Sequence, residues 1–421
     1  MSNIRLINLH SKLAHKDIYQ HNFNFYVLNG VLFALTNGVV KSYLPKFLDR
    51  IHGTPWDFTL FSALPGLLAA LATIPGMIWL SKSRNIQGTM IKMFLTSRLF
   101  WLLYALVPLL PEARQPIFFV LLTAFMNFPE IPSVTALQSF AGDIFSQEQR
   151  TNAISLRNKV STLAQIVAML IMGQLLSLRA FSPATMLTVY QVIFVLSFLI
   201  GLWEITTFAR LKPLQTQQAR PLLLQEFLTS CKGVWYHRKF RLFLLCSLLF
   251  HFGWQMGWPL FALYQIQYLG AGEGWLTILT VSMNIVMFFS FNFWNRLIII
   301  KGNSLSLAFA TFGMAVTPIL YALSPNLWIM TLTGIITGFF TAGTITVILT
   351  SLLEAAPEND RVIFIGIHAT LTNLTLVLGP MLGNLVLVRS NIYVALLVTS
   401  LFRLVGSTAF YFRNRLVKAH S

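Results

Sequence analysis

The chain has 421 residues, of which 56% are hydrophobic and only 10% are charged. Soluble domains carry roughly 25% charged residues, so the composition excludes an ordinary soluble protein and indicates one embedded in a membrane. The net charge of +17 does not indicate a nucleic-acid-binding surface, because the basic residues are scattered over short connectors and do not gather on one face with base-stacking aromatics.

Twelve apolar stretches are long enough to cross a bilayer, which takes about 20 residues. The first is full length and is expected to be retained, since residues 1–22 carry four charged side chains and no short apolar run with a cleavage site. The predicted spans cover residues 23–47, 57–80, 89–110, 116–141, 152–177, 185–208, 241–268, 274–295, 304–323, 327–353, 361–388 and 391–412.

Lysine and arginine lie mostly on one side of the predicted bundle. With the N-terminus in the cytoplasm, 22 of them fall in cytoplasmic connectors or end turns, and five fall outside. This positive-inside bias predicts a multi-pass protein of the cell (plasma or inner) membrane with both termini cytoplasmic. Three cations, Lys41, Arg98 and Arg403, lie deeper within spans.

The longest connector, residues 209–240, divides the chain into two halves of six spans, 1–208 and 241–421. It contains Pro221-Leu-Leu-Leu-Gln-Glu-Phe-Leu and a basic end, which predicts an amphipathic helix on the cytoplasmic membrane surface. Such a helix is either a hinge or regulatory element or a tether to anionic lipid, and we favour the tether.

The two halves carry related turns. Glu148-Gln-Arg150 follows span four, and Pro357-Glu-Asn-Asp-Arg361 follows span ten, so an acidic residue and an arginine precede a long span in both. Parallel six-span repeats are a known plan of transporters. Together with the twelve spans and the long central connector, these turns resemble the major facilitator superfamily. The resemblance implies an all-α membrane fold of twelve transmembrane helices in two pseudo-symmetric six-helix bundles.

The resemblance also implies a cytoplasmic gate at these turns, formed by Arg150 and Arg361 with Glu148 and Glu358. Two departures leave the subfamily open. The loop after span two, Gly76-Met-Ile-Trp-Leu-Ser-Lys82, lacks the aspartate of the family pattern. The Gly-Pro motif of antiporter members is present in span eleven but absent from span five.

A carboxylate lies near the middle of span four, between two prolines, as Pro129-Glu130-Ile-Pro132. An ionised side chain at that depth costs roughly 3 kcal/mol or more, so it is usually paired, protonated on demand or turned toward water. Arg98 in span three lies about nine residues from its inner end, or roughly 13–14 Å, and Glu130 lies roughly 16 Å from the inner end of span four. We predict that the two form a pair, either a titratable proton-coupling site or a static ion pair that fixes helix register.

Five further side chains are candidates for the substrate cavity. Lys41 follows Asn37 in the outer part of span one, and its stem could instead reach the outer interface, which we favour. Trp254 and Gln255 share a face of span seven, and this span lines the cavity in the family that the chain resembles. Asn373 in span eleven completes the set, although for a lone asparagine we favour a hydrogen bond between helices over a contact with the solute.

His251 shares that face of span seven and changes charge near neutral pH, so it is a second candidate for proton coupling. The alternative is a histidine that is hydrogen-bonded within the bundle, for example to Gln255. Span twelve is peripheral in the family that the chain resembles. We therefore expect Arg403 in this span to pack against neighbouring helices or to contact the lipid interface.

The sequence carries no Walker loop, no metal-spaced His/Cys set and no defensible nucleophile–base pair, so we expect neither an enzyme nor a bound cofactor. Cys231 and Cys246 predict no disulfide framework. We predict a monomeric secondary transporter that moves a small organic solute by alternating access, with proton-coupled efflux ahead of the alternatives. These are a proton-coupled metabolite uptake symporter and a transport-dead membrane sensor or assembly factor. The partners are the solute, protons and the lipid bilayer, without nucleic acid.

Overall fold

The computed structural model describes residues 2–177, 182–213, 233–234, 236–357 and 361–418. Every regular element within these ranges is a helix. Helix α1 passes into α2 through a short π-helix, η1. The first half contains α1 (Ser2–Phe33), η1 (Ala34–Val39), α2 (Val40–Arg50), α3 (Pro55–Lys82), α4 (Ile86–Leu106), η2 (Val107–Leu109), η3 (Glu112–Arg114), α5 (Gln115–Ile144), α6 (Gln147–Leu176) and α7 (Pro183–Ala209).

The second half begins after the long connector. It contains α9 (Arg238–Leu263), η4 (Tyr264–Tyr268), α10 (Glu273–Ala322), α11 (Leu327–Ala355), α12 (Arg361–Arg389) and α13 (Ile392–Lys418). The predicted amphipathic helix of the connector falls largely on residues 214–232, which lie outside the described ranges.

The helices agree with the predicted number of membrane crossings. Ten of them are long and apolar enough to span a membrane. One of these, α10, has 50 residues and supplies two crossings, because Gly302 leaves the helical region with φ 77° and ψ 163°. The rings of Trp294 and Phe309, on either side of this glycine, lie 5.5 Å apart, so the chain reverses there. Helix α9, with 26 residues, is the remaining crossing.

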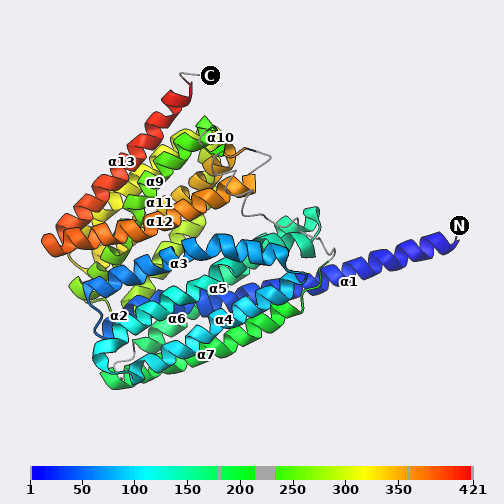
Figure 1. Ribbon diagram of the computed structural model, residues 1–421, viewed down its shortest axis with the longest axis horizontal. Helices are drawn as coiled ribbons and strands as arrows, with labels where there is room; N and C mark the ends of the chain where they lie inside the picture. The colour runs from blue at the N-terminus through cyan, green and yellow to red at the C-terminus, as the bar shows by residue number, and fades with distance from the viewer. Residues whose placement is uncertain (1, 178–181, 214–232, 235, 358–360, 419–421) are drawn as a thin grey trace.

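The chain forms two bundles that meet along a few helices. In Figure 1, α9 to α13 lie above α1 to α7. Within the first bundle α3 packs on α5, α4 on α5 and α7, and α1 on α6 and α7. Within the second, α10 packs on α11 and α13, and α9 on α12 and α13. The bundles touch where α3 contacts α12 and α9, and where α6 and α2 contact α10. This arrangement is the predicted pair of six-helix bundles.

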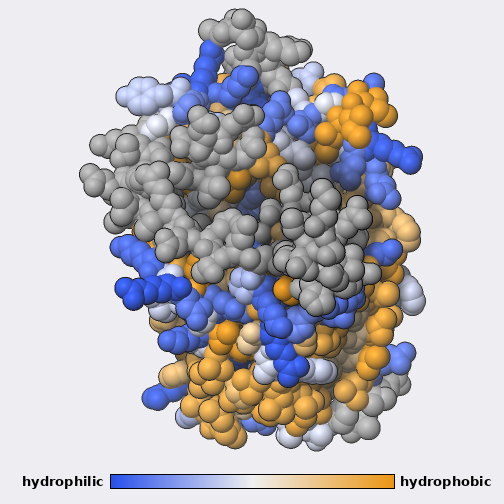
Figure 2. All heavy atoms as spheres, turned by 90° about the vertical axis from the view of Figure 1, so that its right-hand side faces the viewer, coloured by the Kyte–Doolittle hydropathy of each residue, from blue (hydrophilic) through white to orange (hydrophobic). Residues whose placement is uncertain are grey.

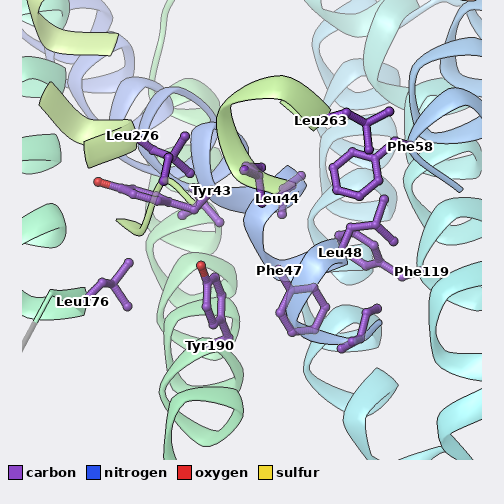
Figure 3. Packing of buried hydrophobic residues seen from close by; sticks show 14 of the residues in the cluster. Tyr43, Leu44, Phe47, Leu48, Phe58, Phe119, Leu176, Tyr190, Leu263 and Leu276 are labelled. Carbon is purple, nitrogen blue, oxygen red and sulfur yellow. The ribbon is translucent and has the colours of Figure 1, made fainter. Parts of the chain in front are cut away.

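Among the described residues, the hydrophobic core that the two bundles share lies at one end of the molecule. One buried cluster takes residues from both halves, including Phe47 and Tyr190 of the first and Leu276 of the second. Figure 3 shows these side chains around α2. Toward the chain termini, each half has a cluster of its own, represented by Phe145 and by Phe243. We call the joined end the closed end and the opposite end, which carries the termini, the terminal end.

The outer surface matches a membrane setting. Large hydrophobic side chains stay exposed along the flanks of the bundles, among them Phe125, Phe289, Leu332 and Leu401. In water such a surface would be unusual for a monomer, whereas lipid tails accommodate it. Figure 2, which looks onto the terminal end, shows hydrophilic residues there and hydrophobic residues along the edges.

Candidate functional site

Glu130 lies on α5 at a point where the helix backbone is interrupted twice. Pro129 and Pro132 each remove a backbone N–H donor, and the hydroxyl of Ser133 donates to the carbonyls of Pro129 and Glu130 at 3.0 and 2.8 Å. Helix α3 makes room for this segment, because a Cβ at Gly76 would lie 2.4 Å from Cγ of Pro132. The prolines are thus held by packing and local hydrogen bonds, and Glu130 is 2% exposed.

Two cations from other helices share one oxygen of the Glu130 carboxylate. Nζ of Lys41 on α2 donates to Oε1 at 3.1 Å, and Nη1 of Arg98 on α4 lies 3.7 Å from the same atom. The second oxygen, Oε2, is buried and has no hydrogen-bond partner among the described residues.

Arg98 and Glu130 lie close together, as predicted from their similar depths in the membrane. Arg98 nevertheless forms its hydrogen bonds with other residues. Its Nε and Nη2 donate to the two carboxylate oxygens of Glu204 on α7, each at 3.0 Å. Gly201 makes this possible, because a Cβ there would lie 2.7 Å from Cδ of Arg98. Both groups are almost fully buried, and breaking such a pair from one side costs about 3–5 kcal/mol. The sequence analysis did not predict this contact.

Lys41 does not snorkel, so the interpretation that we favoured from the sequence is wrong. The physical reason is the π-helix η1, which holds Asn37 just before α2. A π-turn adds one residue to a helical turn and rotates the residues after it. Lys41 therefore reaches Glu130 and not the outer interface. Asn37 donates to Thr36 at 3.3 Å, and its Oδ1 is a second buried acceptor without a partner among the described residues.

Arg157 on α6 extends this group of charges toward the terminal end. Its guanidinium lies 4.9 Å from the ring centroid of Tyr26, and its Nε has no hydrogen-bond partner among the described residues. It is close enough to Glu204 for an electrostatic interaction. We call Lys41, Glu130, Arg98, Glu204 and Arg157 the charge cluster.

The second half contributes neutral polar groups. The Nδ1 atom of His251 lies 2.8 Å from the carbonyl oxygen of Ser247, which can only accept, so the proton of the neutral ring is on Nδ1. The hydroxyl of Ser247 also contacts Nε2 of His368 on α12 at 2.8 Å. His251 is therefore hydrogen-bonded within the bundle, through Ser247 and not through Gln255.

Gln255 accepts a hydrogen bond from Thr375 on α12 at 2.7 Å and is 6% exposed, so it joins α9 to α12. Trp254 is partly buried with its ring 5.5 Å from that of His251. Asn373 is partly buried. These residues do not join the charge cluster through any contact between described side chains.

The predicted gate falls where little can be described. Arg150, Glu148 and Arg361 lie at helix starts whose side chains are outside the description, and Glu358 is outside the described residues altogether. Among the described residues, no group of three or more histidine, cysteine, aspartate or glutamate side chains could hold a metal ion.

The comparisons with known proteins agree with this architecture. A family profile described as Major Facilitator Superfamily matches residues 243–420. The profile covers 178 of the 421 residues, all of them in the second half of the chain. No curated protein sequence matches the chain.

Solved structures extend the likeness over both halves. A nucleoside transporter, NupG, is similar with a TM-score of 0.75 and 11% identity, over 94% of this chain and 99% of that one. A D-xylose–proton symporter has a TM-score of 0.67 and 13% identity, over 94% and 96%. A bacterial homolog of the human lysosomal transporter Spinster has a TM-score of 0.67 and 12% identity, over 95% and 97%. At such low identity the likeness establishes the fold alone.

The closed end of the protein is fastened by side chains that cross between the bundles. Arg50, at the end of α2, forms a bidentate ion pair with Glu273, at the start of α10, with Nη2 2.9 Å from Oε2. Tyr190 on α7 donates to the same carboxylate at 3.2 Å. Tyr43 on α2 shares a hydrogen bond of 2.6 Å with Thr277 on α10. Sequence reasoning missed this network, although the predicted topology already places Arg50 and Glu273 on the same side of the membrane.

Arg403 is fully buried, so the lipid-interface interpretation is wrong and the packing interpretation stands. Its Nη1 donates to the carbonyl of Met314 at 2.9 Å. That carbonyl lacks its usual helical donor, because the residue four positions later is Pro318. Arg403 also donates to the carbonyls of Gly253 and Trp254 at 3.1 and 3.0 Å. It therefore joins α13 to α9 and α10.

Proposed function

We propose that this protein is a secondary active transporter that moves a small organic solute by alternating access and couples the movement to protons through Glu130. The observation that carries the proposal is the buried position of this carboxylate between cations of two other helices. Its Oε1 contacts Lys41 of α2 and Arg98 of α4. Protonation removes the negative charge and weakens both contacts, so the charge state of Glu130 changes how α2, α4 and α5 are held together.

The position of Glu130 supplies the physical requirement for coupling. A proton can bias a conformational equilibrium only if its affinity differs between the two states. Lys41 belongs to α2, which is bonded to the second half through Tyr43 and Arg50. Movement of the halves apart at the closed end would therefore shift Lys41 relative to Glu130 and change the proton affinity of the carboxylate.

The conformation supports alternating access. The halves share one hydrophobic cluster at the closed end and have separate clusters at the terminal end. With both termini cytoplasmic, as the charge bias predicts, this conformation faces inward. A cytoplasmic reporter fused to the C-terminus should be active, and a periplasmic reporter there should be silent. The opposite pattern would reverse the assignment of the two ends.

The direction of transport is a separate part of the proposal. Export of an amphipathic solute is the expectation from the sequence, and proton-coupled uptake of a metabolite is the second candidate. Inverted and right-side-out vesicles distinguish the two, because only one of them accumulates the solute under a given pH gradient. A transport-dead sensor would show no flux in either.

The direct test is solute-driven proton movement in proteoliposomes that contain a pH-sensitive dye. A thermal-shift screen of the purified full chain first supplies the solute. Glu130→Gln should abolish the proton movement, since the amide keeps size and hydrogen bonding but does not titrate. The matched control is Glu354→Gln, because Glu354 is exposed at the terminal end and bonded to Asn303. Normal proton movement in Glu130→Gln would overturn the proposal.

A further inference from the structure

The charge cluster hides its negative groups and presents its positive ones. The side chains of Glu130 and Glu204 are each 3% exposed and that of Arg98 is fully buried, whereas the side chain of Lys41 is 36% exposed. Arg157 is also partly exposed. The two members that a ligand can reach are therefore both cations.

The second half does not compensate for this charge. Residues 241–421 contain four acidic side chains, and all of them lie at span ends: Glu273, Glu354, Glu358 and Asp360. Glu273 is already bound to Arg50 at the closed end. The middle of the second half contributes Arg403, which is buried and hydrogen-bonded to backbone carbonyls. A cationic ligand would thus meet repulsion in the middle of the bundle without an accessible carboxylate to offset it.

We propose that the transported solute carries an anionic group, a carboxylate, sulfonate or phosphate, and that Lys41 binds it at the level of Glu130. This inference rests on the proposed transport function and names its substrate class. Arg157 would meet the anion first. It packs against Gly30, where a Cβ would lie 2.5 Å from its Cγ, and Lys41 follows eleven residues later in the same run of helix, roughly 16 Å farther from the terminal end. The ammonium of Lys41 has three donors, so an anion can approach it while the lysine stays on α2.

Proton binding and anion binding are linked at Lys41, because Glu130 occupies it in the structure. When a proton binds Oε2, Glu130 becomes neutral and Lys41 loses its charged acceptor. An anion can then take the place of the carboxylate, with no covalent bond made or broken. Proton and solute bind together and move in the same direction, which favours the uptake alternative over export.

The other ionisable groups around Glu130 do not prevent this exchange. Helix α4 contributes Arg98, which remains paired with Glu204 of α7, and Tyr104, which is neutral and buried. The ionisable residues of α3, Asp57 and Lys82, lie at its two ends. Arg157 of α6 lies nearer the terminal end and adds positive charge.

The test is a thermal-shift series on the purified full chain at pH 5.5 and pH 8. The probes share one carbon skeleton and differ in charge: benzoate, benzenesulfonate, phenyl phosphate, benzamide and benzylamine, with inorganic phosphate as the inorganic member. We expect the organic anions to stabilise the protein, benzamide to act weakly and benzylamine not at all. The anion affinity should be higher at pH 5.5, and in Glu130→Gln it should be high at both pH values.

Substitutions at Lys41 and Lys46 show which side chain binds the anion. Lys41→Gln should weaken the anion response about tenfold or more, the size expected for losing a charge-assisted hydrogen bond. Lys41→Arg should restore much of it and shows that the fold is kept. Lys46→Gln is the matched control, because Lys46 lies on the same helix and pairs with Asp49 at the closed end.

Four results would overturn the proposal: no response to any organic anion, an equal response to benzylamine, an equal response to inorganic phosphate, or full anion affinity in Lys41→Gln. A pH-independent anion response that still requires Lys41 has a different meaning. It supports the substrate class and counts against proton coupling through Glu130, so the two failures are distinguishable.

Discussion

The ion pair between Arg50 and Glu273 should hold the closed end shut, and Arg50→Gln should open it. Glu273 is 3% exposed and accepts both hydrogen bonds of Arg50, so the substitution leaves a buried carboxylate with Tyr190 alone. Breaking a buried pair from one side costs about 3–5 kcal/mol. The side chain of Arg50 is 26% exposed, which lowers the estimate to about 2 kcal/mol. In the open state the carboxylate is hydrated, so the cost falls on the closed state only, and the open fraction should rise about 30-fold.

The assay is labelling of a cysteine at Leu276 by a membrane-impermeant thiol reagent, in a chain where Cys231 and Cys246 are replaced by serine. Leu276 is buried against Tyr43 of the first half (Figure 3). The rate should rise in Arg50→Gln and stay unchanged in Lys46→Gln, which removes a neighbouring ion pair within the first half. Adding Glu273→Gln to Arg50→Gln should bring the rate partly back, since no unpaired carboxylate remains. Equal rates in all variants would refute the idea that this ion pair closes the molecule.

Three further predictions concern packing and the second half. Gly173→Ala should also raise labelling from the closed side, because its Cβ would lie 2.0 Å from Oγ1 of Thr277 in the other half. Unchanged labelling would mean that the interface adjusts freely. Arg403→Gln should destabilise the protein by about 2–4 kcal/mol in thermal unfolding, and Pro318→Ala in the same chain should recover part of the loss by restoring a backbone donor. A loss that Pro318→Ala leaves untouched would contradict this reading. His251→Gln should leave accumulation driven by a pH gradient intact, and its loss would move the coupling site to α9.

The fold could be predicted because its signals are local. The length of the apolar stretches was enough to predict most of the spans. Gly302, where the chain reverses, lies within the short connector predicted between spans eight and nine. The pairing of Arg98 with Glu130 followed from equal depth on consecutive helices. The contacts that sequence reasoning missed depend on rotation about helix axes, which depth does not determine. The π-helix before Lys41 is such a rotation, and it directs that side chain to Glu130.

Contacts between the two halves were beyond the sequence argument for a different reason. Arg50 and Glu273 are separated by 223 positions, and a single sequence does not say which helices of the two halves meet at a given end. Arg403 was misjudged because its partners are backbone carbonyls, which have no sequence signature apart from the proline that frees one of them.

The central claim is that Glu130 binds and releases the coupled proton, and one measurement in proteoliposomes tests it most directly. Accumulation driven by a pH gradient and counterflow exchange without a gradient are compared in wild type and Glu130→Gln, with the solute that the thermal-shift series identifies. Titration is needed for the first process and not for the second. The account predicts that Glu130→Gln loses gradient-driven accumulation and keeps counterflow. Accumulation against the gradient at the wild-type rate in Glu130→Gln would contradict it and would make Glu130 a structural ion-pair partner of Lys41 and Arg98.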